Sequence, residues 1–149
     1  MKRMLDDLPL GHEFPCGSFR LGREEIVDFA KRFDPQPWHL SDELAAPTYF
    51  KTLCASGVHS QAMAIGLMVR AITDVDVVAG GSLNQATFFT PVRPNTDYTV
   101  SAVWIHIRPS RSNPARGAAT IDITARDPTG HVVMTCGVTY IVGRLVPGG

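Results

Sequence analysis

The sequence has 149 residues, with 14 basic and 14 acidic side chains and a formal net charge of zero. This length suits one domain with a substantial core, and we expect a single domain over residues 1–149. The neutral balance argues against a general attraction to nucleic acid or to anionic membranes, so we expect neither as a partner.

The cysteines and the apolar runs indicate the compartment. Cys16, Cys54 and Cys136 lie far apart and form no C-x-x-C pair, so neither a disulfide framework nor a metal site is expected. The start, MKRMLDDLPLGHEF, has acids where a signal peptide needs an apolar stretch. The most apolar run, residues 62–69, is much shorter than the roughly 20 residues that span a bilayer. We therefore expect a soluble, cytoplasmic protein.

In chain order, the first clear element is a helix over residues 22–33, GREEIVDFAKRF. Acids occupy its first turn and bases its last turn, which complements the helix dipole. Pro35 ends the helix, because proline disfavours helical geometry at the preceding residue. A short second helix is expected to begin at Ser41, a good N-cap, and to continue through DELAA. The apolar residues of the first helix recur on one face: Ile26, Phe29, Ala30 and Phe33.

The segment CASGVHSQAMAIGLMVRAI predicts a longer helix that is apolar nearly all round. Such a helix must be buried on nearly all sides, so we expect it in the core. Its first turn, by contrast, is polar, and we call this turn the mouth of the helix. The residues of this mouth are Ser56, Gly57, His59, Ser60 and Gln61.

The rest of the chain is strand-like. LNQATFF, DYTVSAVWIHI, GAATIDITAR and HVVMTCGVTYIVG are expected to be strands, and the third alternates apolar and polar residues with period two. DPTG predicts a tight turn before the last strand, and AGGS at residues 79–82 is interpreted as a flexible connection. No helix-length spacer separates the late strands, so they should be antiparallel neighbours. The pattern favours an α+β architecture, with a curved sheet wrapped around one long helix.

Three segments resemble the MaoC-like dehydratase family, whose hot-dog fold is a long central helix wrapped by an antiparallel sheet. FDPQPWHLSDELA resembles the family's Asp-x-x-x-x-His motif with its trailing acidic helix. CASGVHSQAM occupies the place of the small-residue, His-Gly start of the central helix. FFTPVRPNTDYTV with IRPSRSNPARG is similar to the strand–turn–strand that follows. The resemblance covers roughly Leu8 to Val142.

The resemblance implies reversible addition of water to a 2-enoyl-CoA, or elimination from a 3-hydroxyacyl-CoA, without a metal or redox cofactor. By position, Asp34 and His39 match the catalytic pair, and Gly57 matches the glycine whose N–H polarises the thioester carbonyl. It also implies a homodimer with sheets joined edge to edge and the acyl-CoA bound across the interface. This chain departs from the usual family pattern at Gln36, which replaces an Asn, and at Ser56, which replaces a His. A Ser that some members carry deeper in the helix is, counting without gaps, Ile65 here.

The residues themselves support the same chemistry. Hydration needs a base for water, an acid for Cα, and donors for the charge on the thioester oxygen. Asp34 and His39 can supply the first two roles, and spacing does not decide which takes which. Two prolines restrict the backbone between them, and apolar neighbours should bury both groups and move both pKa values toward neutrality. The alternative is a helix-terminating turn aspartate and a surface histidine.

The mouth of the long helix fits a carbonyl-polarising role, because helix N-termini present unpaired N–H groups and partial positive charge. The missing side chain at Gly57 lets a substrate approach closely, although a packing glycine is an equal alternative. Cys54 is interpreted as a small apolar filler, not a nucleophile. We expect four further side chains to contact substrate: Trp38, Ser56, His59 and Ser60.

Arg108, Arg111 and Arg116 cluster in the turn-rich segment RPSRSNPARG. Guanidinium groups suit the phosphates of CoA, so these arginines are candidate substrate-binding residues. The alternative is a solvated charged hairpin.

Two other functions stay open at this point. An acyl-CoA thioesterase on the same fold would need an acid on or beside the central helix, and residues 58–72 contain neither Asp nor Glu. A non-catalytic acyl-CoA-binding or oligomer-building module is compatible with the changes at Gln36 and Ser56.

Overall fold

The computed structural model describes residues 1–146 and 148. A short 3-10 turn at Leu5–Asp7 precedes the first strand, and a second one at Pro37–His39 follows the first helix. The helices are α1 (Arg23–Phe33), α2 (Asp42–Ala45) and α3 (Gly57–Ala71). The strands are β1 (Phe14–Phe19), β2 (Val77–Phe88), β3 (Tyr98–Pro109), β4 (Arg116–Arg126) and β5 (Val132–Gly143).

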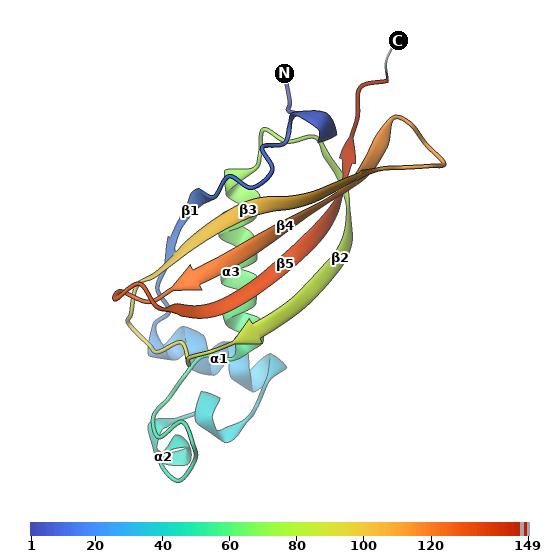
Figure 1. The fold of residues 1–149 in the computed structure, drawn as a ribbon. Helices are drawn as coiled ribbons and strands as arrows, with labels where there is room; N and C mark the ends of the chain where they lie inside the picture. The colour runs from blue at the N-terminus through green and yellow to red at the C-terminus, as the bar shows by residue number, and fades with distance from the viewer. Residues whose placement is uncertain (147, 149) are drawn as a thin grey trace.

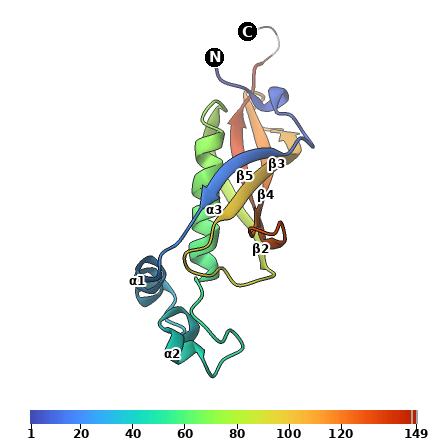
Figure 2. The same cartoon turned by 90° about the vertical axis from the view of Figure 1, so that its left-hand side faces the viewer.

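The five strands form one antiparallel sheet in the order β1-β3-β4-β5-β2, so β1 and β2 are its edges. The sheet curves around α3, which crosses one face of it, while α1 and α2 lie beyond one end (Figures 1 and 2). This arrangement confirms the predicted α+β hot-dog fold.

The core lies between α3 and the concave face of the sheet. β4 follows the period-two pattern, with buried residues at every second position from Gly117 to Ala125. Trp104, Ile121 and Ile123 are fully buried, as is Met68 of α3. Burying each such side chain contributes about 1.5–3 kcal/mol, so this layer fixes α3 against the sheet.

The two predicted early helices are confirmed. The Glu25 carboxylate accepts a hydrogen bond from the Gly22 N–H at 3.2 Å, and the Ser41 hydroxyl oxygen accepts one from the Leu44 N–H at 3.1 Å. Both are N-terminal caps, which satisfy donors that the first helical turn leaves unpaired. α1 ends at Phe33, so Asp34 stands at its C-terminus as expected.

The strands differ from the prediction in two places. β2 begins at Val77, so AGGS is part of the strand and is not a flexible connection. A Cβ atom at Gly81 would lie 2.8 Å from the Thr139 carbonyl oxygen, so close approach to β5 explains this glycine. β1 was not predicted, because Pro15 and a bulge near Gly17 mask its pattern.

α3 is less enclosed than its composition predicted. Ala64 and Met68 face the core, but Val58 is 57% exposed and Val69 is 44% exposed. The prediction that α3 is buried on nearly all sides is therefore wrong for the isolated chain. No helix among the described residues is both long and apolar enough to cross a membrane.

Candidate active site

The site forms at the end of the molecule where α1, the Pro37–His39 turn and the start of α3 meet. Asp34 directly follows α1, and His39 closes the 3-10 turn. The Asp34 Oδ2 atom lies 3.4 Å from the His39 Nε2 atom, and the two side chains are 20% and 7% exposed. The structure thus brings the predicted pair together and contradicts the alternative of a surface histidine. Pro37 favours this geometry, because its fixed φ suits the first position of a helical turn.

A hydrogen bond at Nδ1, the ring nitrogen that does not face Asp34, fixes the orientation of the His39 ring. Its Nδ1 atom lies 2.7 Å from the Cys54 carbonyl oxygen, which can only accept a hydrogen bond. Nδ1 therefore carries a hydrogen, and Nε2 is the nitrogen that faces Asp34. The Cys54 backbone is itself fixed, because its N–H donates to the Trp38 carbonyl at 3.0 Å. Cys54 thus matters through its backbone, and burial raises the pKa of its thiol above the ordinary value.

The Asp34 carboxylate accepts hydrogen bonds from Ser56 and Gln36, two residues at which this chain differs from the usual family pattern. The Ser56 hydroxyl donates to Oδ2 at 2.7 Å, and the Gln36 amide donates to Oδ1 at 2.9 Å. Burial acts to raise the pKa of Asp34, but these two donors and the charge of His39 outweigh it and leave that pKa below its ordinary value. The expected shift of this pKa toward neutrality is therefore wrong, because hydrogen bonding to the charged form exceeds desolvation. Ser56 and Gln36 keep the carboxylate ionised and oriented.

The mouth of α3 lies beside this pair. The Ser60 N–H donates to the Ser56 carbonyl at 3.1 Å, and that bond begins the helix. Within the described part of the chain, no acceptor takes the N–H groups of Gly57 and Val58. The phenyl ring of Phe88 covers Gly57, because a Cβ atom there would lie 2.6 Å from its Cζ atom. Gly57 is thus required for packing and leaves an unused donor at the same point.

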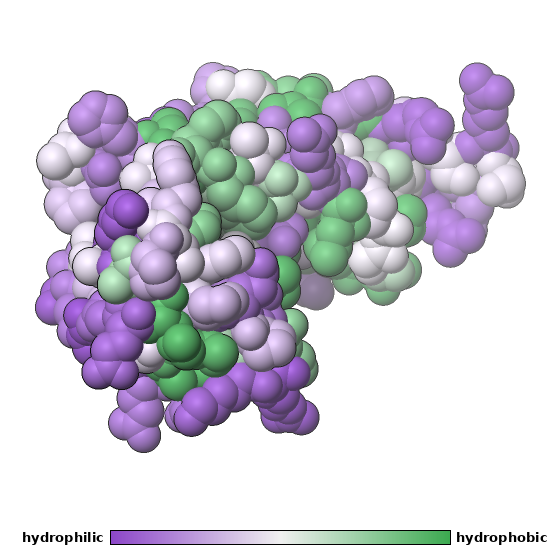
Figure 3. Space-filling model, turned by 90° about the horizontal axis from the view of Figure 1, so that it is seen from below, coloured by the Kyte–Doolittle hydropathy of each residue, from purple (hydrophilic) through white to green (hydrophobic). Residues whose placement is uncertain are grey.

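A pocket of about 510 Å³ opens above the mouth. Figure 3 views this end of the molecule and shows apolar side chains among polar ones at the surface. The pocket contains Asp34 and His39 at one side, and Trp38 and Ser60 line it as predicted. Ser56 is fully buried beneath Asp34 and does not line the pocket. The remaining walls are mostly apolar, from Tyr49, Phe50, Val58, Phe88, Phe89 and Val92.

His59 points away from the pocket, so its predicted contact with substrate is not found in this chain. Its ring stacks on Phe29 of α1, with centroids 4.2 Å apart and planes inclined by 10°. Burial lowers the pKa of His59, against the opposing charge of Glu25. Its Nδ1 atom is buried without a hydrogen-bond partner among the described residues.

Sequence reasoning missed the residues that hold the pocket wall. The Arg93 guanidinium donates to the carbonyls of Phe50, Thr52 and Leu53, at 2.9, 2.8 and 3.4 Å. It thereby fixes the loop that carries Phe50, which packs on Trp38 at 5.1 Å between ring centroids. The only sequence signal for this role was the position of Arg93 within FFTPVRPNTDYTV. No local pattern indicates that its partners are backbone carbonyls some 40 residues away.

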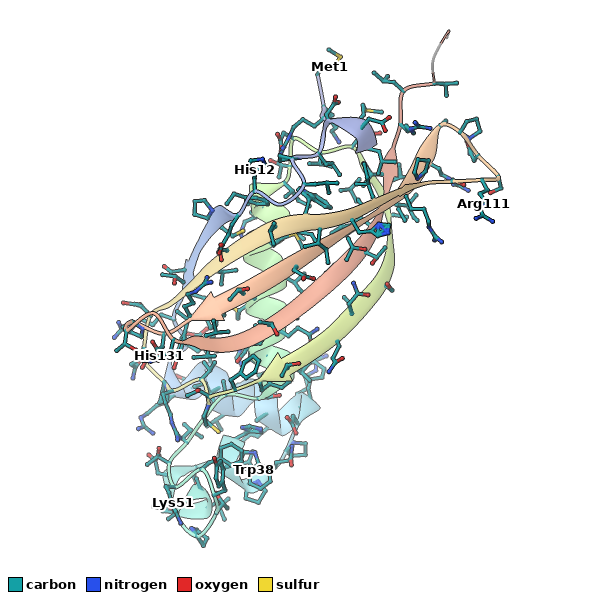
Figure 4. All side chains as sticks on the ribbon, in the orientation of Figure 1. Met1, His12, Trp38, Lys51, Arg111 and His131 are labelled. Atoms are coloured by element: carbon teal, nitrogen blue, oxygen red, sulfur yellow. The ribbon has the colours of Figure 1, made fainter. Side chains whose placement is uncertain are left out.

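The three candidate arginines lie elsewhere. Arg108, Arg111 and Arg116 line a separate pocket of about 560 Å³ at the β3–β4 hairpin. Figure 4 shows Arg111 and Trp38 at opposite ends of the molecule. Within one chain, these arginines do not contribute to the pocket of Asp34 and His39. In the described residues, no group of three His, Cys, Asp or Glu side chains is placed to hold a metal ion.

Comparisons with known proteins agree with this fold. The family model described as MaoC like domain matches residues 13–126. The uncharacterized protein YdeM of Bacillus subtilis is 29% identical over 109 residues, which are 72% of this chain and 77% of YdeM. The MaoC-like dehydratase from Rhodospirillum rubrum is 30% identical, with a TM-score of 0.86 over 97% of this chain and 99% of that one. The (R)-hydratase from A. caviae involved in PHA biosynthesis shares the fold, with 21% identity and a TM-score of 0.70 over 89% of this chain and 96% of its own.

Proposed function

The chain belongs to the MaoC-like dehydratase family, and from this premise we propose that it adds water to 2-enoyl-CoA thioesters or eliminates it from 3-hydroxyacyl-CoA thioesters. The observation that carries the proposal is the Asp34–His39 pair, at 3.4 Å, in a pocket above the unpaired N–H groups of α3. The mostly apolar walls suit an acyl chain.

The mouth of α3 supplies the electrophilic part of the mechanism. Negative charge builds on the thioester oxygen when water attacks Cβ, and preorganised N–H donors stabilise it. The Gly57 N–H is a donor of this kind, reinforced by the partial positive charge at the start of a 15-residue helix. Because Phe88 covers Gly57, we propose that this ring moves aside or packs along the thioester when substrate binds.

We assign the base role to Asp34 and the acid role to His39. Asp34 is held ionised by Ser56 and Gln36, so its free electron pairs can accept a proton from water. His39 keeps one hydrogen on Nδ1 toward the Cys54 carbonyl, so it delivers the proton for Cα from Nε2. The proton that Asp34 has taken from water then passes to Nε2, 3.4 Å away, which restores both groups for the next turnover. The hydroxyl group is added at Cβ and the proton at Cα, and this chemistry needs no metal or redox cofactor. Positioned acid–base groups contribute about 10²–10⁴-fold each to a rate.

The assembly that we propose is a homodimer joined through β2. This edge strand has 12 residues, VVAGGSLNQATF, with no charged side chain and no proline, and its Leu83 is 69% exposed. A long edge without charges or proline can pair with another strand. The other edge, β1, has six residues and contains Pro15, and register shifts occur on both edges. The three free cysteines suit a reducing compartment, so the cytoplasm remains our proposed location.

The test is a steady-state screen of enoyl-CoA and 3-hydroxyacyl-CoA thioesters of increasing chain length. We expect the enoyl absorbance to change without release of free thiol, and Asp34→Asn and His39→Ala to abolish that change with the fold intact. Release of free CoA would instead identify a thioesterase. A wild-type chain that binds acyl-CoA but turns over none of them would identify a binding module.

A further inference from the structure

The catalytic pocket is rich in aromatic rings. The chain has 7 Phe, 3 Tyr and 2 Trp residues, and five of these line this one pocket. They come from two segments that are distant in the sequence, the loop around the Pro37–His39 turn and α2, and the end of β2. The five residues are Trp38, Tyr49, Phe50, Phe88 and Phe89.

One of these rings lies beside the reacting groups. Trp38 directly precedes His39, and the two ring centroids are 5.9 Å apart with planes inclined by 73°. The indole is half-buried and forms part of the pocket wall. Since Asp34 and His39 act on Cβ and Cα, the indole is placed to contact the substituent that Cβ carries. Trp38 therefore acts on the first atoms of the acyl group beyond the double bond.

The indole is fixed by other rings. Phe50 packs on Trp38 with centroids 5.1 Å apart and planes inclined by 32°, and Tyr49 meets Phe50 edge-on at 5.4 Å. The Arg93 guanidinium holds the Phe50 carbonyl at 2.9 Å. These contacts order the aromatic wall before a ligand arrives, which lowers the cost of binding.

The rings at the end of β2 have no such aromatic partners among the described residues. Phe88 is 51% exposed and Phe89 is 60% exposed, although both line the pocket. The Phe89 backbone is fixed, because its N–H donates to the Val133 carbonyl at 2.8 Å. Exposed apolar rings in a pocket indicate an apolar ligand that covers them.

From this arrangement we propose that the preferred substrates carry an aromatic ring on Cβ, as 3-aryl-2-enoyl thioesters or the corresponding 3-aryl-3-hydroxyacyl thioesters. The inference rests on the proposed hydratase function and names its substrate class. Trp38 is the residue that determines this specificity, and Phe89 contributes to it.

The physical reason is the geometry of ring contacts. Aromatic rings attract one another in offset or edge-on pairs with centroids about 4.5–7 Å apart, beyond the effect of burial alone. A 3-aryl-2-enoyl group is flat, because its ring is conjugated with the double bond and the carbonyl. It can therefore lie along the fixed indole while its thioester oxygen lies at the Gly57 N–H. A straight alkyl chain gains burial only, and it loses internal freedom when it is ordered.

The first experiment measures dehydration of 3-hydroxy-3-phenylpropanoyl-CoA and of 3-cyclohexyl-3-hydroxypropanoyl-CoA, which has a ring of the same carbon count that is neither flat nor aromatic. In Trp38→Leu, the ratio of kcat/KM for the phenyl substrate to kcat/KM for the cyclohexyl substrate should fall about 3- to 10-fold below the wild-type ratio. Trp38→Phe should keep most of the ratio. Any disturbance of the neighbouring His39 lowers both rates and leaves the ratio unchanged. A wild-type ratio in Trp38→Leu overturns the inference.

A second pair of variants separates the pocket wall from the fold. Phe89→Leu should lower the ratio, because it removes a ring from the other segment of the wall. Phe14→Leu is the matched control, since Phe14 is a half-buried ring of β1 outside this pocket, and it should keep the wild-type ratio. If Phe14→Leu lowers the ratio as much as Trp38→Leu does, the effect comes from the fold and the inference fails.

Failure of the hydratase function would look different. Dehydration of straight-chain 3-hydroxyacyl-CoA with no change of the ratio in any variant leaves the function standing and refutes the aromatic preference. If the wild type dehydrates none of these thioesters, calorimetry with 3-phenylpropenoyl-CoA and 3-cyclohexylpropenoyl-CoA still tests the wall. Tighter binding of the phenyl compound that is lost in Trp38→Leu then supports the aromatic site and refutes turnover, whereas equal binding of the two refutes the inference as well.

Discussion

The two ends of this molecule carry pockets of similar size and opposite character. The pocket at the mouth of α3 has about 510 Å³, mostly apolar walls, and ionisable groups that satisfy one another. The pocket at the β3–β4 hairpin has about 560 Å³, and its arginines form no ion pair with any residue that the structure describes. One end holds ionisable groups that hydrogen-bond with their neighbours, and the other exposes positive charge to solvent.

This difference separates two kinds of binding energy. Interactions that form only in the transition state raise kcat, whereas contacts made equally in the ground state and the transition state lower KM. Changes at the α3 mouth should therefore alter turnover or its pH dependence. Changes at the hairpin, which lies at the other end of the molecule, should leave that pH dependence unchanged. The following substitutions test whether the two ends are independent in this way.

The largest effect is expected from Asp34→Asn. The amide cannot accept the proton of water, so kcat should fall about 10²–10⁴-fold while the shape and hydrogen bonds of the site are largely kept. Steady-state kinetics with an enoyl-CoA thioester measure the loss. Asp28→Asn, at an exposed position on α1, is the matched control and should retain activity. Equal losses in both variants would show that Asp34 has no special role.

Gly57→Ala should be the next most damaging change. The added methyl group would lie 2.6 Å from Phe88 Cζ, so either the ring or the start of α3 must shift. We expect kcat/KM to fall about 10- to 100-fold, because one misplaced donor at the developing oxyanion costs that much or more. In a Phe88→Leu background the methyl group has room, and part of the loss should return if crowding is the cause. The same loss in both backgrounds would indicate that the methyl group blocks substrate itself.

The sequence was sufficient to predict the fold and the proximity of Asp34 and His39, because both depend on local patterns. Amphipathic spacing, caps and a helix-ending proline placed Asp34, and period-two alternation placed β4. β1 was missed because Pro15 and a bulge interrupt its alternation. The predicted start of β2 was too late, because Gly80 and Gly81 were interpreted as a loop. Gly81 is in fact needed for the close approach of β2 to β5, a contact that the sequence alone does not reveal.

The missing parts of the site depend on contacts between segments far apart in the chain. The sequence identified Ser56 and Gln36 as departures from a pattern, but not as donors to the same carboxylate. It therefore also gave the wrong direction for the pKa of Asp34. His59 lies two residues after Gly57, yet helical geometry turns it toward Phe29 and away from the pocket. Arg93 carries no local signal, because its partners are backbone carbonyls of a distant loop.

A smaller effect, on pH dependence, is expected from Ser56→Ala. The fully buried hydroxyl donates to Asp34 Oδ2, and its loss should raise the pKa of Asp34 toward the ordinary value. The base must be ionised, so the acidic limb of the kcat/KM profile should move to higher pH, with roughly ten-fold lower activity at the low-pH side. The stability that ionised Asp34 contributes is lost as pH falls through its folded-state pKa, so acid unfolding should also begin at higher pH. An acidic limb that stays in place would show that Ser56 does not control this carboxylate.

The smallest effect is expected from Arg93→Gln, which acts on the pocket wall and not on the reacting groups. The shorter amide cannot reach the carbonyls of Phe50 and Thr52 together, so the loop between α2 and α3 loses the contacts that fix it. We expect about 1–3 kcal/mol lower stability by chemical denaturation and a KM raised a few-fold with kcat nearly kept.

Arg70→Gln is the control, because Arg70 is exposed on α3 and does not touch this loop. The rise in KM should be the same for CoA and pantetheine thioesters, since the wall contacts the acyl end. A rise confined to the CoA thioester would mean that the two ends are coupled, and that the catalytic pocket also senses the phosphates.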